Sequence, residues 1–213
     1  MMKTLLARLA WLILLAGACA AVHAQPVAGR EYQVLDSAST AQGSEPIEVI
    51  EFFYYGCPVC YEAQPHIARW LLSAGTSVQL KRVPAVSGPA FETFARIFYA
   101  LESTGLVARL HWPVYDNHHF DGRRLNEEKN LLDWLQSNGV DSARFKLALD
   151  SHEVKLRVDA AGALLDNYKV RGVPTMIVDG RYLTSALLAG GVKEMMDVVE
   201  HLVARAREER GKK

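Results

Sequence analysis

The chain has 213 residues, of which 24 are basic, 24 are acidic and half are hydrophobic, so its formal net charge is zero. Neither nucleic acid nor an anionic membrane surface is expected as a partner, because both are bound by basic faces. The length suits one domain with an insertion, and the hydrophobic content is sufficient for a sizeable core.

The first 24 residues are typical of a secretory signal peptide. A basic start precedes an apolar stretch over residues 9–21, and small residues lead to a cleavage site after Ala24. The apolar stretch is too short for a comfortable membrane span, which disfavours an uncleaved anchor. Cys19 is disfavoured as a lipid-attachment site, because Ala16 stands where such sites usually have a large aliphatic residue. Cleavage would remove Cys19 and leave two cysteines.

A strand–helix–strand unit is predicted early in the mature chain, after a short edge strand at 32–35. Residues 47–55 are mostly β-branched or aromatic, which suits a buried strand. A helical pattern runs from Cys57 to about residue 73, and Pro65 is expected to kink this helix. The alternating segment 77–83 predicts the next strand, parallel to the first because a helix connects the two.

The middle of the chain, between about residues 88 and 170, is predicted to be helical without strands. Apolar side chains recur there at helical spacing, and a turn is expected near Pro113. Asn126, Asp141 and Ser151 are expected to cap three of these helices. The predicted helices cover residues 91–101, 107–120, 127–138, 141–149 and 151–168.

Strands return near the C-terminus. Residues 175–178 and 181–184 predict a hairpin around Asp179-Gly180. An amphipathic closing helix is expected over residues 192–206. The charged stretch after it is predicted to be a solvated helix end.

The chemistry is expected at Cys57-Pro58-Val59-Cys60, where a strand leads into a helix. Two cysteines three residues apart in a first helical turn can bring their sulfurs within bonding distance. Unpaired backbone N–H groups and the positive end of the helix dipole favour a thiolate there. Pro58 suits the first turn, because its missing N–H would have no helical partner. Cys57 is predicted to be the exposed nucleophile and Cys60 the buried resolving thiol.

Two other roles for this cysteine pair are weaker. A structural disulfide that closes so short a loop would remove little entropy from the unfolded chain. A zinc site is disfavoured because one Cys-X-X-Cys motif supplies only two ligands, and no histidine or second cysteine pair stands at finger spacing. No metal site is expected, and the mature histidines are predicted to be surface or cap residues. They are His66, His111, His118, His119, His152 and His201.

The order of elements and three motifs resemble the DsbA family of exported bacterial thiol oxidases. The resemblance implies an α/β thioredoxin-like fold with an inserted all-helical subdomain. It divides the chain into a signal peptide (1–24), a first thioredoxin part (25–86), the helical insertion (87–170) and a second thioredoxin part (171–213). The motifs are Glu51-Phe52-Phe53, Cys57-Pro58-x-Cys60-Tyr61 and Arg171-Gly172-Val173-Pro174.

The resemblance also implies a function. The protein is expected to be a periplasmic thiol:disulfide interchange protein that donates its Cys57–Cys60 disulfide to newly exported, cysteine-containing proteins. A DsbB-type membrane quinone reductase is expected to reoxidise it, no bound cofactor is needed, and a monomer is expected. Pro174 is expected to form a cis bond facing the disulfide, with the Val173 backbone pairing with an extended client strand.

Three further residues are expected to tune the site. The resemblance implies that Glu51 lies beneath the disulfide and pairs with Lys81, although a rim position for Glu51 and a surface position for Lys81 remain alternatives. The family often has a second acid where this chain has Gln64. Val59 replaces the histidine of the usual Pro-His dipeptide. Since a stabilised thiolate makes a disulfide oxidising, the valine predicts a higher pKa for Cys57 and a less oxidising pair than in a Pro-His relative.

Two competing functions remain open. A periplasmic reductase or isomerase, for example one serving cytochrome c maturation, remains an alternative, because the missing histidine predicts a less oxidising cysteine pair. Against this, a valine at position 173 resembles the pattern of the oxidases, whereas the exported isomerases typically carry threonine at that position. The other competitor is a periplasmic chaperone or peptide-binding module whose cysteines are incidental.

Overall fold

The structure is a computed structural model that describes residues 25–36 and 46–212. The predicted signal peptide and most of the loop before the first long strand lie outside these residues. Within them, no helix is both long enough and apolar enough to cross a membrane.

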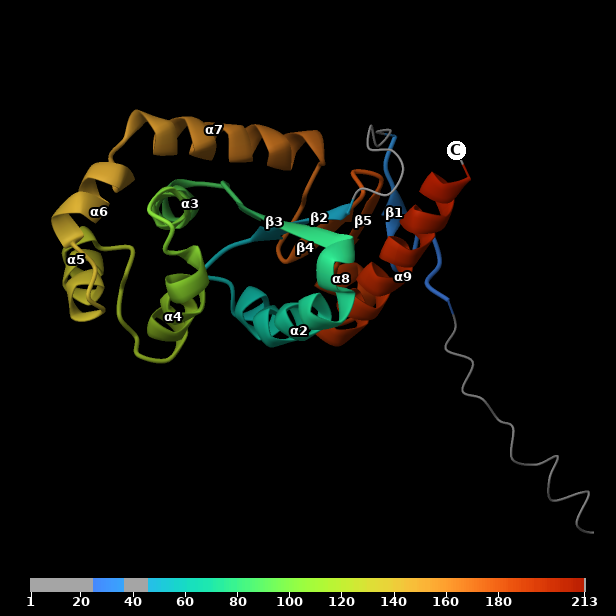
Figure 1. Ribbon diagram of the computed structural model, residues 1–213, viewed down its shortest axis with the longest axis horizontal. Helices are drawn as coiled ribbons and strands as arrows, with labels where there is room; N and C mark the ends of the chain where they lie inside the picture. The colour runs from blue at the N-terminus through green and yellow to red at the C-terminus, as the bar shows by residue number, and fades with distance from the viewer. Residues whose placement is uncertain (1–24, 37–45, 213) are drawn as a thin grey trace, which may run out of the picture.

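The described residues form a five-stranded mixed sheet in the order β1-β5-β4-β2-β3 (Figure 1). The central strand β2 runs parallel to β3 and antiparallel to β4, and β5 joins β4 to β1 through antiparallel pairing. The strands predicted from the sequence are therefore confirmed. Their bounds are β1 Gln33–Val34, β2 Ile47–Phe53, β3 Val78–Pro84, β4 Thr175–Val178 and β5 Tyr182–Ser185.

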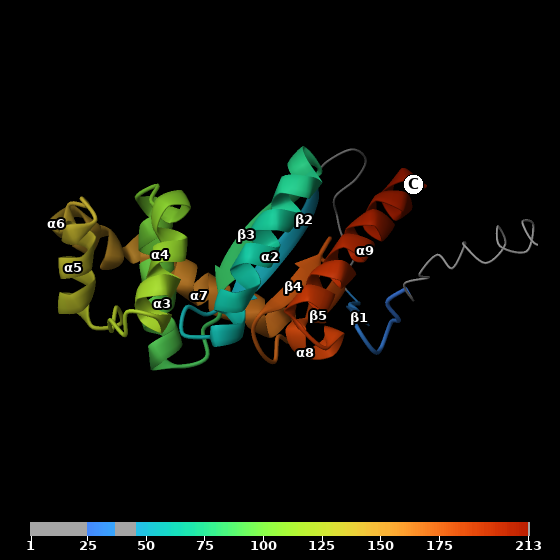
Figure 2. The ribbon, with the colours of Figure 1, turned by 90° about the horizontal axis from the view of Figure 1, so that it is seen from below.

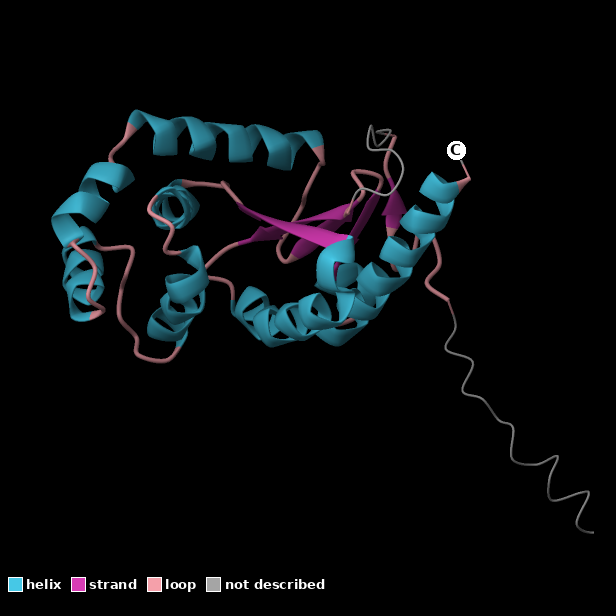
Figure 3. Cartoon of the chain, viewed as in Figure 1, coloured by secondary structure: helices cyan, strands magenta, loops and turns pink. Residues whose placement is uncertain are grey.

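Most of the helices form two groups, and the short α8 follows β5 (Figures 1 and 3). Helices α2 and α9 lie side by side on one face, where they pack on each other and on the central strands (Figure 2). The second group, α3 to α7, forms the helical part between β3 and β4, and α3 and α7 contact β3. The bounds are α2 Pro58–Ala74, α3 Pro89–Ser103, α4 Val107–His119, α5 Glu128–Ser137, α6 Ser142–Leu149, α7 His152–Asn167, α8 Ala186–Ala189 and α9 Val192–Gly211.

The alternation of side chains along β2 divides the core into two clusters. Ile47 and Val49 pack with α2 and α9, whereas Ile50 and Phe52 belong to the cluster shared with the helical part. Because successive strand residues point to opposite faces, Glu51 faces the same side as Val49. The Glu51 carboxylate, in the middle of this strand, therefore points toward helix α2.

Two local predictions in the helical part were wrong. Helix α4 continues through Pro113, whose turn was expected to break it, because its Leu110, Val114 and Tyr115 are buried on both sides of the proline. Asn126 does not cap α5, since a turn closed by the Glu127 N–H and the Arg124 carbonyl precedes a helix that begins at Glu128. By contrast, the capping side chains predicted for α6 and α7 accept hydrogen bonds from backbone N–H groups as expected.

The closing helix α9 is longer than predicted and its end is not merely solvated. Arg210 is 7 % exposed and forms an ion pair with Asp179 in the β4–β5 turn. Asp179 and Gly180 both have positive φ angles, as an Asp-Gly hairpin turn requires. The turn and the helix end thus stabilise each other through a buried pair.

Candidate active site

The cysteine pair lies where β2 leads into α2. Cys57 is the N-cap residue of α2, and its Sγ accepts a hydrogen bond from the Cys60 N–H at 3.3 Å, while Pro58 opens the first turn. Gly56 is required in this turn, because a Cβ there would lie 2.5 Å from Tyr54 Cε1. The strand-to-helix junction predicted from the sequence is therefore confirmed.

The two thiols have opposite environments. Cys57 is half-buried, whereas Cys60 is completely buried. Hydrogen bonding from the Cys60 side chain lowers the pKa of Cys57 to about 6. Partial burial of Cys57 opposes this by raising the pKa, while hydrogen bonds from the N–H groups of the first turn lower it further. Burial raises the pKa of the Cys60 thiol well above its ordinary value. The arrangement suits an ionised, accessible sulfur at Cys57 and a protonated, protected one at Cys60.

The loop before β4 faces Cys57. The Val173–Pro174 peptide bond is cis, as predicted. The Cys57 Sγ lies 3.6 Å from the Val173 carbonyl oxygen, to which the protonated form of this thiol donates a hydrogen bond. Thr175 Oγ1 donates to the Gly172 carbonyl at 2.7 Å, which braces the loop from the other side.

An ion pair between a buried acid and a partly exposed cation lies beneath the cysteines, but its cation is not the predicted one. Glu51 is fully buried, and its Oε2 lies 3.1 Å from Arg82 Nε, close enough for an ion pair although not aligned as a hydrogen bond. Lys81 is exposed. The parallel register places Arg82 beside Glu51 and Lys81 beside Ile50, so Lys81 points to the opposite face. The predicted Glu51–Lys81 pair was therefore wrong by one residue.

The carboxylate of Glu51 also accepts a hydrogen bond from Gln64 Nε2 at 2.9 Å. Burial raises the pKa of Glu51, while Arg82 and the Gln64 hydrogen bond partly oppose this effect. The amide at position 64 therefore contacts the acid directly. A buried acid with a raised pKa is a suitable proton acceptor for a nearby thiol.

His111 is part of the same buried network, which contradicts its prediction as a surface or cap residue. It is 7 % exposed, and its two ring nitrogens contact Tyr55 Oη and Gln64 Oε1. Its position was signalled by the buried stripe of α4, which Leu110 and Val114 continue. A histidine on an apolar helical face is usually bonded within the core, and that is the case here.

Aromatic side chains surround the outer edge of the site. Tyr61 donates to Asp116 Oδ1 at 2.6 Å and makes ring contacts with Trp112 and Phe120. Trp112 is 38 % exposed and Phe120 is 76 % exposed, whereas Trp70 and Trp134 are buried. This apolar surface adjoins the active-site helix.

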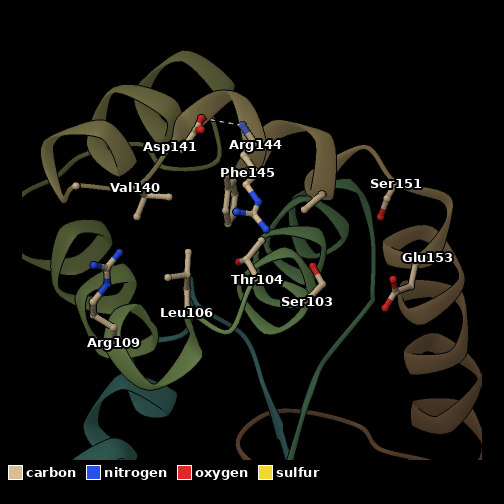
Figure 4. A pocket seen from close by; sticks show the side chains of 12 residues that line it. Ser103, Thr104, Leu106, Arg109, Val140, Asp141, Arg144, Phe145, Ser151 and Glu153 are labelled. Carbon is tan, nitrogen blue, oxygen red and sulfur yellow. Dashed lines mark hydrogen bonds between the residues drawn. The ribbon is translucent and has the colours of Figure 1, made fainter.

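Two cavities differ in their relation to the cysteines. A cavity of about 270 Å³ extends from Val173 and Pro174 to Leu187 and Leu188, next to the cis bond. Another, of about 550 Å³, lies within the helical part, where Figure 4 shows Arg144 and Phe145 reaching into it. Its lining includes neither the cysteines nor the cis loop, whereas the first cavity borders the cis loop that faces Cys57. In the described part of the chain, no three His, Cys, Asp or Glu side chains are grouped to hold a metal ion.

Comparison with known proteins agrees with this geometry. The model of the DSBA-like thioredoxin domain family matches residues 48–203. The chain belongs to the DsbA family. It is 32 % identical over 179 residues to the thiol:disulfide interchange protein DsbA of Azotobacter vinelandii, covering 84 % of each chain. It is 31 % identical over 211 residues to the DsbA of Burkholderia cepacia, covering 99 % of this chain and all of the relative.

Solved DsbA structures share the fold. The crystal structure of Pseudomonas aeruginosa DsbA superposes with a TM-score of 0.80 at 33 % identity, covering 88 % of this chain and 97 % of that one. The DsbA oxidoreductase of Xylella fastidiosa gives a TM-score of 0.78 at 28 % identity, covering 86 % and 98 %. The thioredoxin-like fold with a helical insertion, expected from the sequence, is thus confirmed for this DsbA-family chain.

Proposed function

We propose that this DsbA-family protein is a periplasmic disulfide donor that transfers its Cys57–Cys60 bond to newly exported proteins. It is a thiol:disulfide oxidoreductase. The single observation that supports the donor role best is the contrast between the two thiols, because a pKa of about 6 at Cys57 favours the reduced, thiolate form. A disulfide whose reduced form is stabilised is a strong oxidant.

The reaction requires two exchanges. A client thiolate attacks the Cys57 sulfur of the oxidised pair, a client–Cys57 bond forms, and the Cys57–Cys60 bond breaks with its electron pair on Cys60. Because burial raises the pKa of Cys60, this sulfur takes up a proton, and Glu51, whose charge acts on the same sulfur, is the acid that would relay it. The second client thiolate then attacks the client sulfur of the mixed disulfide, and Cys57 departs as a stable thiolate.

The client is expected to lie across the cis loop. The Val173 backbone would pair with an extended client segment beside Cys57, in the manner of strand addition. The neighbouring cavity extends toward Leu187, a residue that is 91 % exposed, and would bind an apolar side chain of the client. Pro174 would hold this backbone in position.

The partners and location follow the family. Reoxidation by a DsbB-type membrane quinone reductase would return the pair to its oxidised form, so no cofactor has to be bound by this chain. A leader of the kind predicted for residues 1–24 would direct the protein to the periplasm. There it would act as a monomer.

The redox potential of the purified mature protein, equilibrated with glutathione, tests the donor role. A value well above the roughly −270 mV of thioredoxin supports donation. A value at or below that of thioredoxin would instead support the competing reductase, which the valine at position 59 favours.

The Val59→His variant is expected to have a lower pKa at Cys57 and a more oxidising pair. Val59 is 39 % exposed in the first turn of α2, where a histidine would add a donor and positive charge beside the thiolate. One such interaction corresponds to about 30 mV, or tenfold in the equilibrium with glutathione. Titration of the thiol and the glutathione equilibrium measure both changes, and Val59→Leu is the matched control. If wild type, Val59→His and Val59→Leu have the same Cys57 pKa and the same equilibrium with glutathione, this explanation of the Pro58-Val59 dipeptide is refuted.

A further inference from the structure

A buried chain of hydrogen bonds joins the helical part to the active-site helix. Tyr55 Oη lies 2.8 Å from His111 Nδ1, and His111 Nε2 lies 3.3 Å from Gln64 Oε1. Gln64 Nε2 in turn lies 2.9 Å from Glu51 Oε1. Each of these four side chains is at most 7 % exposed. The chain thus ends on the carboxylate that lies beneath the cysteines.

The carboxylate sets the direction of every hydrogen bond in this chain. The Gln64 amide nitrogen faces two acceptors, Glu51 Oε1 and, at 3.1 Å, the Cys60 carbonyl, so it must donate and its oxygen must accept. His111 Nε2 therefore carries the hydrogen that Gln64 accepts. In a neutral imidazole Nδ1 is then an acceptor, and it receives the Tyr55 hydroxyl hydrogen. All three bonds donate toward Glu51, which allows each to polarise the next.

The surroundings keep His111 neutral. Burial, with the positive charge of Arg82 acting in the same direction, lowers the pKa of His111 to about 3. Phe98 of α3 and Phe53 of β2 cover the ring with aromatic surface. The titratable and charged groups around the chain are Glu51, Tyr55, Cys57, Cys60, Arg82 and Tyr115.

We propose that His111 is a positioning residue for thiol exchange: it holds the Gln64 amide with its NH₂ group toward Glu51, so that this carboxylate stays ionised and able to take the Cys60 proton. The inference rests on the proposed function and deepens it. Without His111, the Gln64 Oε1 has lost its donor, and only Glu51 and the Cys60 carbonyl still orient the amide. The amide is then held less firmly, and a weaker hydrogen bond to the ionised carboxylate favours the protonated acid, which cannot accept a proton.

The step concerned is the closure of the internal disulfide. When Cys57 carries glutathione in a mixed disulfide, Glu51 takes the proton of the Cys60 thiol. The Cys60 thiolate attacks the Cys57 sulfur and forms the Cys57–Cys60 bond. The bond between Cys57 and glutathione breaks, and glutathione leaves with the electron pair as a thiolate. Oxidised glutathione supplies the oxidising equivalents.

The experiment follows this closure step across an acidic to neutral pH series. The reduced mature protein is mixed with excess oxidised glutathione, quenched with acid at intervals, and the decay of the mixed disulfide is measured by mass spectrometry. In wild type the rate is expected to rise as Glu51 ionises. In His111→Leu the rise should move to higher pH, with closure about tenfold slower at the acidic end, the size of one lost hydrogen bond to a charged group.

Three variants distinguish positioning from packing. His111→Gln places an amide donor near the former Nε2 and is expected to restore the wild-type profile. Tyr55→Phe removes the donor to Nδ1 and should shift the profile in the same direction as His111→Leu, by less. Tyr115→Phe removes a buried hydroxyl without a hydrogen-bond partner, from a ring that packs on both His111 and Tyr55, and should leave the profile unchanged.

The outcomes are separable. Coincident pH profiles for wild type, His111→Leu and Tyr55→Phe would overturn the positioning role, as would an equal shift in Tyr115→Phe or a failure of His111→Gln to restore the profile. If His111→Leu does not fold, the Tyr55→Phe and His111→Gln profiles decide the question. A wild-type protein that forms no mixed disulfide at all would instead overturn the proposed function.

Discussion

The Cys57→Ser variant is expected to lose disulfide transfer down to the uncatalysed background. The thiolate is the group that exchanges, and of the two cysteines in the described residues only Cys57 combines partial exposure with a lowered pKa. The measurement is the oxidation of a reduced, cysteine-containing peptide by the protein, followed by loss of free thiols. A serine hydroxyl at position 57 has no comparable acidity, so it cannot substitute.

The Cys60→Ser variant is the matched comparison. It retains the attacking sulfur and lacks the resolving one, so it should capture clients as stable mixed disulfides on Cys57 without completing their oxidation. Non-reducing electrophoresis would reveal these adducts. Unimpaired client binding and refolding by Cys57→Ser, together with no adduct in Cys60→Ser, would favour the chaperone function over the redox one.

The Arg82→Met variant is expected to lower the free energy of unfolding by about 3–5 kcal/mol at neutral pH. It leaves the fully buried Glu51 carboxylate without its cation, and an uncompensated buried charge is costly. Denaturant unfolding by circular dichroism measures the loss. Methionine retains an unbranched apolar stem like that of arginine, so packing changes are kept small.

Lys81→Met is the control for Arg82→Met. Lys81 is exposed and points to the opposite face of β3, so its substitution should change stability by less than about 0.5 kcal/mol. The decrease in the free energy of unfolding caused by Arg82→Met should also become smaller as the pH falls. Burial already raises the pKa of Glu51, and protonation removes the charge that needs a partner. Equal losses in both variants would contradict the assignment of Arg82 as the partner.

The difference between Lys81 and Arg82 illustrates what sequence reasoning could and could not reach. The strands and their parallel arrangement were predictable from β-branched runs flanking a helix, but the register was not. A shift of one residue moves a side chain to the other face, and both candidates are cations. The register of β2 on β3 decides between them, and it depends on the packing of both faces together.

The active site itself was largely predictable because its residues are local in sequence. Cys57, Cys60 and the proline between them fall in one strand-to-helix junction, and Pro174 stood out through its motif. His111 was missed because its partners lie 47 and 56 residues away, on α2 and after β2. Burial of this kind is a property of how the helical part docks, which periodicity alone does not specify.

The docking of α4 gives the helical part a role at the active site. Through His111 and the aromatic rings around it, this helix contacts the residues that hold Glu51 beneath the cysteines. Trp112 of α4 and Phe120, which directly follows the helix, are exposed and lie beside Tyr61 at the outer edge of the site. Helix α4 therefore contributes both exposed apolar surface next to the cysteines' helix and a contact to the amide that bonds the buried acid.

The central claim is that the Cys57 sulfur is ionised at neutral pH. The most direct test is the rate of alkylation of the reduced protein by iodoacetamide across a pH series, with peptide mapping to locate the label. The account predicts modification of Cys57 alone, with a half-maximal rate near pH 6. A half-maximal rate near the ordinary thiol value of about 8.5, or equal labelling of Cys60, would contradict it.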